Sequence, residues 1–401
     1  MALMPVAEAL ARLTGDAAPL PGESVPLADA AWRVLAADVV ARRTQPPFDA
    51  SAMDGYAVRA VDVATVPSTL RVIGEAPAGR RFGGIVGPGE AVRIFTGAPM
   101  PRGADTILIQ ENATVLEGGG LRADETVAAG RHIRRAGLDF RSGDTLLKAG
   151  RVLDPAALSL AASANHPTLD VVRRPVVAIL ATGDELVAPS AEPGADQIVS
   201  SNSFGVAAAV SAAGGVALDL GIVLDRLEAI AAAIGRARAQ GADVLVTLGG
   251  ASVGDHDLVQ RALVEAGMDL DFWKIAMRPG KPLMFGRLGA LRVLGLPGNP
   301  VASLVCSQVF LVPLIARLAG RPHATRLCEA TLGADMAAND QRQDYVRARV
   351  KDTADGLVAT PFDIQDSSML RLLAEAGGLI VRPPFAPAAA RGSRCDVLLL
   401  R

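Results

Sequence analysis

The chain of 401 residues predicts two to four domains, at the usual size of about 100 to 200 residues for each. Half of the residues are hydrophobic and 20% are charged, which predicts packed cores and excludes a disordered chain. Forty basic against 42 acidic residues give a net charge of −2 with no basic block, so nucleic acid is not expected as a partner.

Residues 1–45 contain two stretches with apolar residues at helical spacing. These are VAEALARL and LADAAWRVLAADVVA, separated by the Pro/Gly-rich turn PLPGESVP, and both are predicted as scaffold helices. Glu8 and Arg12 interrupt the first stretch, so it lacks the basic start and continuous apolar core of a secretory signal.

From Gln45 to about Gly130 the pattern changes to short β-branched runs. LRVIGEA, AVRIFTG and DTILIQENATVL are broken by Gly and Pro, which predicts an inserted β-rich domain over residues 46–130. Residues 131–172 return to a helical pattern centred on PAALSLAASAN. We expect them to join residues 1–45 in one discontinuous helical linker domain.

Residues 173–322 alternate between strand and helix patterns. The hydrophobic runs VVAILATG, VALDLGIV, DVLVTLGG and LRVLGLPG are separated by SFGVAAAVSAAGG, RLEAIAAAIGRARAQG and DLVQRALVEAG, which predicts a parallel α/β sheet. Asn299 and Pro300 are typical of a helix start, and that helix should end near Ala319. Residues 323–401 hold strand-like pieces (TRLCEATL, DYVRARVKD, GLVATPF, GGLIVRP and CDVLLL) and predict a β-rich C-terminal domain.

The sequence predicts neither a membrane span nor a disulfide framework. The late apolar run VFLVPLIA is far shorter than the roughly 20 residues that a bilayer requires. Cys306, Cys328 and Cys395 are widely spaced and have no CxxC partner, which favours a reducing compartment. We therefore expect a cytoplasmic protein without a membrane partner.

The predicted strands of the α/β domain end in polar or glycine-rich loops. These are residues 182–185, 225, 249–257 and 295–300. Because ligands bind outside the carboxyl ends of parallel strands, the loops should meet at one edge. Glycine-rich loops and helix N-termini favour an anion. Glu185, Asp225 and Asp257 offer carboxylates for Mg²⁺ bridged to phosphate, and Arg278 and Lys281 can offset the ligand's charge.

Each of these features also has a purely structural interpretation. Glycine-rich strand ends are often tight turns, Asp225 can be an ordinary helix cap, and Lys281 can be a solvated surface lysine. Their occurrence together is what favours a site for phosphate-linked chemistry with a divalent metal.

The inserted domain carries a second polar cluster in the loop sequence PPFDASAMDGYA. Asp54 can accept hydrogen bonds or act as a base, although an Asp-Gly pair is equally typical of a plain turn. Thr96, at a predicted strand end in RIFTG, can donate to an oxyanion.

Six motifs, in this order and spacing, resemble the MoeA family, which includes the C-terminal domain of gephyrin. They are SAMDGYA, RIFTGAPMP, ATGDEL, GGASVGDHD, RPGKP and GLPGNP, and they span residues 51 to 300. The resemblance implies an α/β multidomain fold. Its parts would be a MogA-like parallel α/β sandwich domain (173–322), a helical linker domain (1–45 plus 131–172), an inserted β-rich domain (46–130) and a small β-barrel-like C-terminal domain (323–401).

The resemblance also implies the activity and the partners. The family inserts molybdate into adenylylated molybdopterin with release of AMP, assisted by Mg²⁺ or alternatively Zn²⁺. It implies a homodimer whose active-site cleft lies between the α/β domain of one subunit and the inserted domain of the other. A MogA-type adenylyltransferase and apo-molybdoenzymes are the implied partners in the pathway.

Position by position, the resemblance and the strand-end loops assign roles to individual residues. Catalytic roles fall on Asp54, Thr96, Glu185 and Lys281, and metal binding on Glu185, Asp225 and Asp257. Substrate binding falls on Asp139, Thr182, Gly249, Gly250, Ser252, Arg278, Lys281, Pro297, Gly298, Asn299, Pro300 and Ser367. No covalent nucleophile is assigned, because positioning and charge neutralisation suffice.

The chain departs from the family pattern at three positions. Leu138 stands where an acidic residue is common, Arg278 where lysine is common, and Asp366, beside Ser367, where glycine is expected. Two other functions were weighed. Residues 173–320 alone resemble a MogA-type adenylyltransferase, but the flanking domains favour the transferase. A gephyrin-like scaffold would call for a fused second domain and a long linker, which this sequence does not contain.

Overall fold

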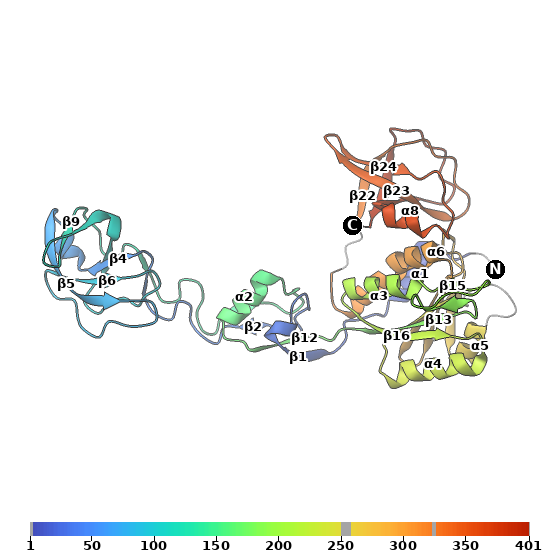
Figure 1. The fold of residues 1–401 in the computed structure, drawn as a ribbon, viewed down its shortest axis with the longest axis horizontal. Helices are drawn as coiled ribbons and strands as arrows, with labels where there is room; N and C mark the ends of the chain where they lie inside the picture. The colour runs from blue at the N-terminus through green and yellow to red at the C-terminus, as the bar shows by residue number, and fades with distance from the viewer. Residues whose placement is uncertain (1–2, 250–257, 323–325, 401) are drawn as a thin grey trace. The chain divides into compact units, whose positions relative to one another are not determined.

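The computed structural model describes residues 3–249, 258–322 and 326–400. The chain divides into two compact units. The first consists of Met1–Glu23, Trp32–Ala36 and Val171–Arg401, and the second of Ser24–Ala31 and Ala37–Asp170. Strands β1 (Gly22–Pro26) and β12 (Thr168–Val172) contain the first and the last of the four points at which the chain passes from one unit to the other (Figure 1).

The first unit contains a six-stranded sheet in the order β16-β13-β17-β21-β20-β18. Its strands are β13 (Val176–Thr182), β16 (Val216–Val223), β17 (Val244–Leu248), β18 (Asp269–Trp273), β20 (Met284–Leu288) and β21 (Leu291–Leu296). The four predicted strands are confirmed and are mutually parallel. The structure adds β18 and β20, and β20 runs antiparallel to both neighbours. Only Gly289 and Ala290 connect β20 to β21, and a connection this short requires the antiparallel direction for that pair.

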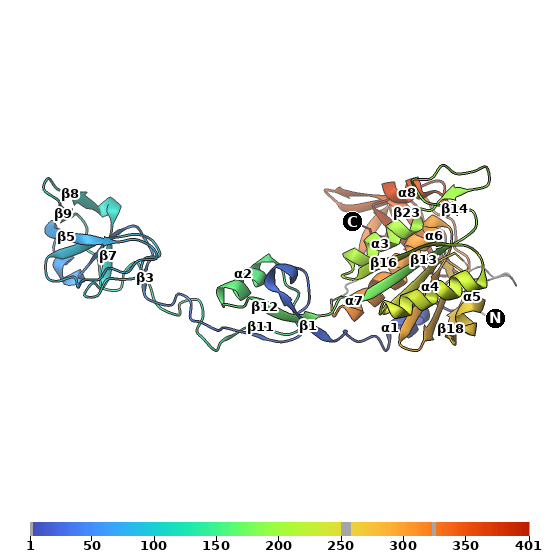
Figure 2. The same cartoon turned by 60° about the horizontal axis from the view of Figure 1, so that its bottom comes forward.

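Helices cover both faces of this sheet, and alternate residues of β13 face them. Val177 and Ile179 pack in a cluster with α1 (Val6–Thr14), α3 (Asn202–Ala212) and α6 (Pro300–Cys306). Ala178 and Leu180 pack with α4 (Leu227–Ala239) and α5 (Leu258–Glu265) on the other face (Figures 1 and 2). Burial on both faces explains why these strands are continuous hydrophobic runs in the sequence.

The helix predicted to begin at Asn299 and end near Ala319 is confirmed as a continuous helix over Pro300–Leu318. It consists of α6, a π-helical turn η4 (Ser307–Leu311) and α7 (Val312–Leu318). Its length and mean hydropathy of 1.9 would allow a membrane span, but 78% of it is buried inside the protein. This burial is that of a core helix of the α/β unit.

The first predicted helix is confirmed as α1, but it packs in the core of the α/β unit. Val6, Ala9 and Leu13 are buried there, in the cluster that also contains residues of α7. The guanidinium Nε of Arg317 donates to the carbonyl of Ala17 at 2.8 Å. The assignment of residues 1–45 as a whole to a linker domain is therefore corrected for α1.

The second predicted helix, LADAAWRVLAADVVA, is wrong. The structure has only a 3₁₀ turn η1 (Leu27–Asp29) and the short strand β2 (Val39–Val40). Trp32 adopts a left-handed backbone with φ of 62°, which interrupts any helix. The buried Val34 accepts a backbone hydrogen bond from Val172 at 2.8 Å, so pairing with a distant segment overrides the helical pattern.

The C-terminal strands close into a five-stranded barrel. They are β22 (Leu327–Leu332), β23 (Gln343–Thr353), β24 (Gly356–Pro361), β25 (Gly378–Arg382) and β26 (Arg394–Leu399). All five were predicted, and the pairing of β25 with β23 closes the ring. The structure adds β19 (Met277–Arg278), which pairs with β23, and the short helix α8 (Leu370–Glu375).

The second unit contains the predicted β-rich domain, a six-stranded sheet in the order β7-β4-β6-β5-β9-β8. Its strands are β4 (Gly55–Val58), β5 (Ser68–Ala76), β6 (Glu90–Ile94), β7 (Thr106–Ile109), β8 (Ala113–Val115) and β9 (Gly120–Ala123). Two short ladders join β3 (Ala50–Ser51) to β10 (Ile133–Arg134) and β2 to β11 (Thr145–Leu147). The helix predicted around residue 160 is confirmed as α2 (Pro155–Ser163), and Asp154 caps it by accepting from Ala157 N–H at 2.7 Å.

Candidate active site

A pocket of about 680 Å³ lies at the carboxyl ends of three parallel strands of the first unit. Thr182 and Glu185 line it after β13, Gly249 after β17, and residues 297–300 after β21. The expectation that the loops meet at one edge is therefore confirmed for these three strand ends, while residues 250–257 of the second loop lie outside the described residues.

Gly249 allows the loops to approach one another closely. Its φ is +93°, and a Cβ on it would lie 2.9 Å from the Thr182 carbonyl oxygen. A Cβ on Gly298 would lie 3.7 Å from the Gly249 Cα. Only glycine fits at position 249, because a side chain would have to displace the backbone that forms the pocket wall.

The N-terminus of α3 also faces the pocket, which the sequence analysis did not anticipate. Ser200, Ser201 and Asn202 line it, and the side-chain amide of Asn202 donates to the Gly298 carbonyl at 2.7 Å. The sequence Ser-Ser-Asn directly before a helical run was the available signal. With the helix that begins at Pro300, two helix N-termini border this space, and both favour a negatively charged ligand.

The C-terminal barrel contributes a further wall. The Asn299 side chain donates to the Ser367 hydroxyl at 2.9 Å, and the Val301 N–H donates to the Ser367 carbonyl at 3.1 Å. Ser368 itself lines the pocket. The structure thus places Ser367, predicted to bind substrate, beside the loop at the end of β21.

Asp366, which departs from the family pattern, stabilises this turn. Its carboxylate accepts from the Ser368 hydroxyl at 2.6 Å and from the Ser368 N–H at 2.8 Å. Both donors lower the pKa of Asp366, and the hydroxyl has the larger effect. An aspartate therefore fixes a turn for which a glycine was expected.

Glu185, which lines the pocket, lies near two further carboxylates, those of Asp184 and Asp225. The Asp225 N–H donates to the Asp184 carboxylate at 3.1 Å. Partial burial raises the pKa of Asp225, and the negative charges of Asp184 and then Glu185 raise it further. Such crowding of like charges would be relieved by a bound cation.

The predicted metal and phosphate loop extends beyond the residues that the structure describes. Gly250, Ser252 and Asp257 lie outside the described residues. Within residues 3–249, 258–322 and 326–400, no three His, Cys, Asp or Glu side chains are grouped closely enough to hold a metal ion.

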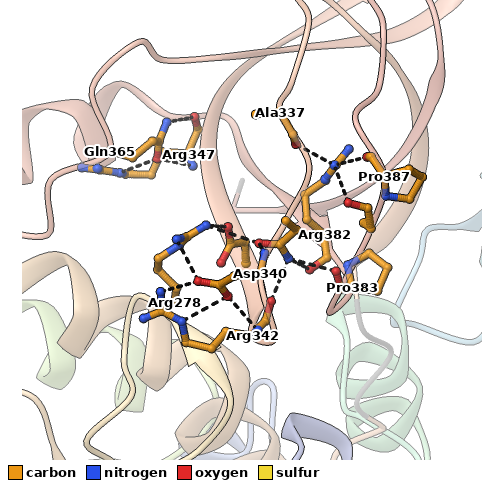
Figure 3. Close-up of polar contacts among 12 residues, drawn as sticks. Arg278, Ala337, Asp340, Arg342, Arg347, Gln365, Arg382, Pro383 and Pro387 are labelled. Atoms are coloured by element: carbon orange, nitrogen blue, oxygen red, sulfur yellow. Dashed lines mark hydrogen bonds and ion pairs between the residues drawn. The ribbon is translucent and has the colours of Figure 1, made fainter.

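The two predicted cations differ in their surroundings. Lys281 is exposed and adjoins Pro282, which lines the pocket. Arg278 instead lines a second cavity, of about 450 Å³, in the C-terminal barrel. There it pairs with Asp344 and, at 3.4 Å, with Asp340 (Figure 3). Its charge is therefore already balanced within the protein, and its role in substrate binding stays a prediction.

In the second unit, Asp54 and Thr96 lie in direct contact. The Asp54 carboxylate accepts from the Thr96 N–H at 2.7 Å and from its hydroxyl at 2.8 Å. Both donors lower the pKa of Asp54, and the N–H has the larger effect. The carboxylate is therefore an ionised acceptor at neutral pH. Arg93 lies 5.0 Å from the rings of both Tyr56 and Phe95 and completes the cluster.

Asp139 lies in the same unit and is exposed. Its N–H donates to the Gln45 carbonyl at 3.0 Å, which leaves the carboxylate on the surface. Leu138, where an acidic residue was expected, is 66% exposed. Its apolar side chain is therefore not required for packing.

Three family models cover nearly the whole chain. The MoeA N-terminal region (domain I and II) matches residues 4–165, a probable molybdopterin binding domain matches residues 178–317, and the MoeA C-terminal region (domain IV) matches residues 329–400. The chain belongs to the MoeA family.

Relatives in this family match the chain along most of its length. A molybdopterin molybdenumtransferase of Bacillus subtilis is 36% identical, over 99% of this chain and 94% of its own. Molybdopterin molybdenumtransferase 2 of Mycobacterium tuberculosis is 36% identical over 93% and 94%. A molybdopterin biosynthesis MoeA protein of Pyrococcus horikoshii has a similar structure, with a TM-score of 0.83, 28% identity and full coverage of both chains.

Proposed function

We propose that this MoeA-family chain is a molybdopterin molybdenumtransferase. It inserts molybdate into adenylylated molybdopterin and releases AMP, in the cytoplasmic synthesis of the molybdenum cofactor. The relatives from Bacillus subtilis and Mycobacterium tuberculosis that carry this name align with 99% and 93% of the chain, so all of its domains have counterparts in them. The adenylyltransferase alternative requires only the α/β domain and leaves those other domains without a role.

The pocket at the strand ends is the observation that carries this proposal. Its backbone amides, two helix N-termini and serine hydroxyls provide donors for a ligand with several negatively charged oxygens. Both an adenylate phosphate and molybdate are ligands of this kind. A volume of about 680 Å³ is in the range of pockets that hold nucleotide-sized ligands.

The acidic edge of the pocket fits a divalent cation that is shared with substrate phosphate. Mg²⁺ commonly takes only one or two protein carboxylates and completes its shell with phosphate oxygens and water. Asp225 and Glu185 are suited to that role, with Asp257 as the third predicted ligand. When bound, Mg²⁺, or alternatively Zn²⁺, would neutralise charge on the phosphate oxygens at the bond to be cleaved.

The protein's own groups would act mainly by positioning. The loops holding Gly249 and Asn299 would orient the phosphate, and the exposed Lys281 would offset its charge. In the second unit, the ionised Asp54 can accept a proton or a hydrogen bond from the substrate, while Thr96 keeps its carboxylate oriented. We include in the proposal that a homodimer brings this cluster to the pocket of the partner subunit.

The proposed activity is tested with purified protein, adenylylated molybdopterin, Mg²⁺ and molybdate, with AMP release and reconstitution of an apo-molybdoenzyme as readouts. Molybdate-dependent AMP release is expected for the wild type and should be lost in Glu185→Ala. Arg261→Ala is the matched control, because Arg261 lies on α5 and pairs with Glu265 on the same helix at 2.7 Å. Adenylylation of free molybdopterin by ATP, with no molybdate-dependent release of AMP, would instead assign the activating step.

A further inference from the structure

Gln365 forms four hydrogen bonds through its side-chain amide, which is all that this amide can make. Its Oε1 accepts from the Arg347 N–H at 3.0 Å and from the Arg347 Nε at 3.3 Å. Its Nε2 donates to the carbonyls of Arg347 at 3.0 Å and of Phe362 at 2.9 Å. Figure 3 shows the two side chains joined in this way. A glutamine bonded on both sides holds one defined orientation.

Arg347 anchors this arrangement in the barrel. Only 1% of its surface is exposed, and this burial lowers the pKa of its guanidinium. Its Nη1 donates to the Met369 carbonyl at 3.1 Å, while its Nη2 has no partner among the residues that the structure describes. Burying a cation in this way is costly, and the bonds it does make are to the loop over residues 362–369.

The same loop forms the barrel wall of the pocket. Arg347 bonds Gln365 at one end and Met369 at the other, and Ser367 lies between these two points. Ser367 in turn accepts from Asn299 at 2.9 Å, and its carbonyl accepts from Val301 at 3.1 Å. A continuous series of contacts thus leads from the barrel core to the loop at the end of β21.

We propose that Gln365 is a positioning residue for the pocket: it fixes the loop so that Ser367 meets Asn299. This inference rests on the proposed function, because it concerns the same pocket. Gln365 does not line the pocket and acts only through Ser367. It therefore controls how well the pocket is formed, and it makes no contact with the ligand.

A double-mutant cycle tests this dependence. Gln365→Met keeps the length of the side chain and removes all four hydrogen bonds, and we expect kcat/KM for molybdate-dependent AMP release to fall about tenfold or more. In a Ser367→Ala background, the same substitution should lower kcat/KM less than about twofold, because the hydroxyl that accepts from Asn299 has been removed. Equal losses in both backgrounds would overturn the proposal.

Gln343→Met is the matched control. Gln343 lies on β23, the strand of Arg347, and donates from its side chain to the Tyr345 hydroxyl at 2.8 Å; among the described residues its side chain has no bond to the 362–369 loop. It should leave turnover unchanged. If Gln365→Met does not fold, Gln365→Glu replaces it: this variant keeps both acceptor bonds to Arg347, loses both donor bonds, and should show a smaller loss that again disappears in Ser367→Ala.

Amide hydrogen exchange on the full chain separates this inference from the activity itself. In Gln365→Met, exchange of the Val301 and Ser368 amides should rise about tenfold, because both are bonded within the loop, while amides in the barrel ladders stay protected. If exchange rises but the wild type shows no turnover, the proposed function fails and the positioning role stands. Unchanged exchange at Val301 and Ser368 would overturn the positioning role whatever the turnover.

Discussion

Replacing Gly249 by alanine should damage the pocket through the backbone alone. Its φ of +93° is a conformation that costs an alanine about 1–2 kcal/mol. The added Cβ would also lie 2.9 Å from the Thr182 carbonyl oxygen, a contact that requires the backbone to move and costs about 1–3 kcal/mol more. We therefore expect the free energy of unfolding of the α/β unit to fall by about 3 kcal/mol.

Gly289→Ala separates the two contributions. Gly289 has a φ of +64°, but a Cβ there would meet nothing within 4 Å, so only the backbone term of about 1 kcal/mol should remain. Urea unfolding followed by the fluorescence of Trp273, in the same sheet, reports on this unit.

The same pair of variants should differ in ligand binding. Calorimetric titration with AMP should show affinity reduced about tenfold in Gly249→Ala and unchanged in Gly289→Ala, because Gly249 borders the pocket and Gly289 lies at a distant turn. If both variants lose the same stability and bind AMP like the wild type, the close contact between the loops does not shape the pocket.

Three further predictions concern charged groups. Asp225→Asn should raise the melting temperature at pH 7. Because folding raises the pKa of Asp225, its charged form destabilises the folded state above that pKa, and asparagine removes the charge. Added Mg²⁺ should raise the melting temperature of the wild type but not of the variant. Thr96→Val should move the pKa of Asp54 upward in an NMR titration, because the carboxylate loses one of its two donors. A carboxyl group whose pKa is lowered by folding stabilises the folded state above about pH 4, and this stabilisation is lost as the pH falls through the folded-state pKa. Acid unfolding of this domain should therefore begin at a higher pH in the variant. Asp243→Ala should lower the free energy of unfolding, measured in urea, by about 2 kcal/mol. The substitution removes the bidentate partner of Arg173, at 2.7 and 3.0 Å, and leaves the Val176 N–H without its acceptor. An unchanged free energy of unfolding would show that water replaces the carboxylate fully.

The four parallel strands of the α/β domain and the five strands of the barrel were predictable because local pattern and tertiary environment agree. β13 is apolar at every position before its last residue, Thr182, since both of its faces are buried. The segment around Trp32 failed because its apolar spacing favours a helix, whereas its burial comes from pairing of Val34 and Leu35 with the distant segment around Val171.

The site was predictable where function requires particular residue types at strand ends. Thr182, Gly249 and Asn299 meet as expected because parallel strands end on the same edge. The contribution of Asn202 was missed, because a helix N-terminus reaches the pocket only through its three-dimensional placement. Nor could sequence show that Arg278 pairs with Asp344, since 66 residues separate them.

The packing of α1 against α7 has a consequence for how the protein is made. The carbonyl of Ala17 accepts a hydrogen bond from Arg317, which lies 300 residues further along the chain and is synthesised much later. At roughly 5 to 20 residues per second, the ribosome needs roughly 15 to 60 s to synthesise that stretch. During this time α1 has already left the ribosome, but the residues of α7 against which Val6, Ala9 and Leu13 pack have not yet been synthesised. The second unit can fold in the interval, whereas the α/β unit can close only near the end of synthesis.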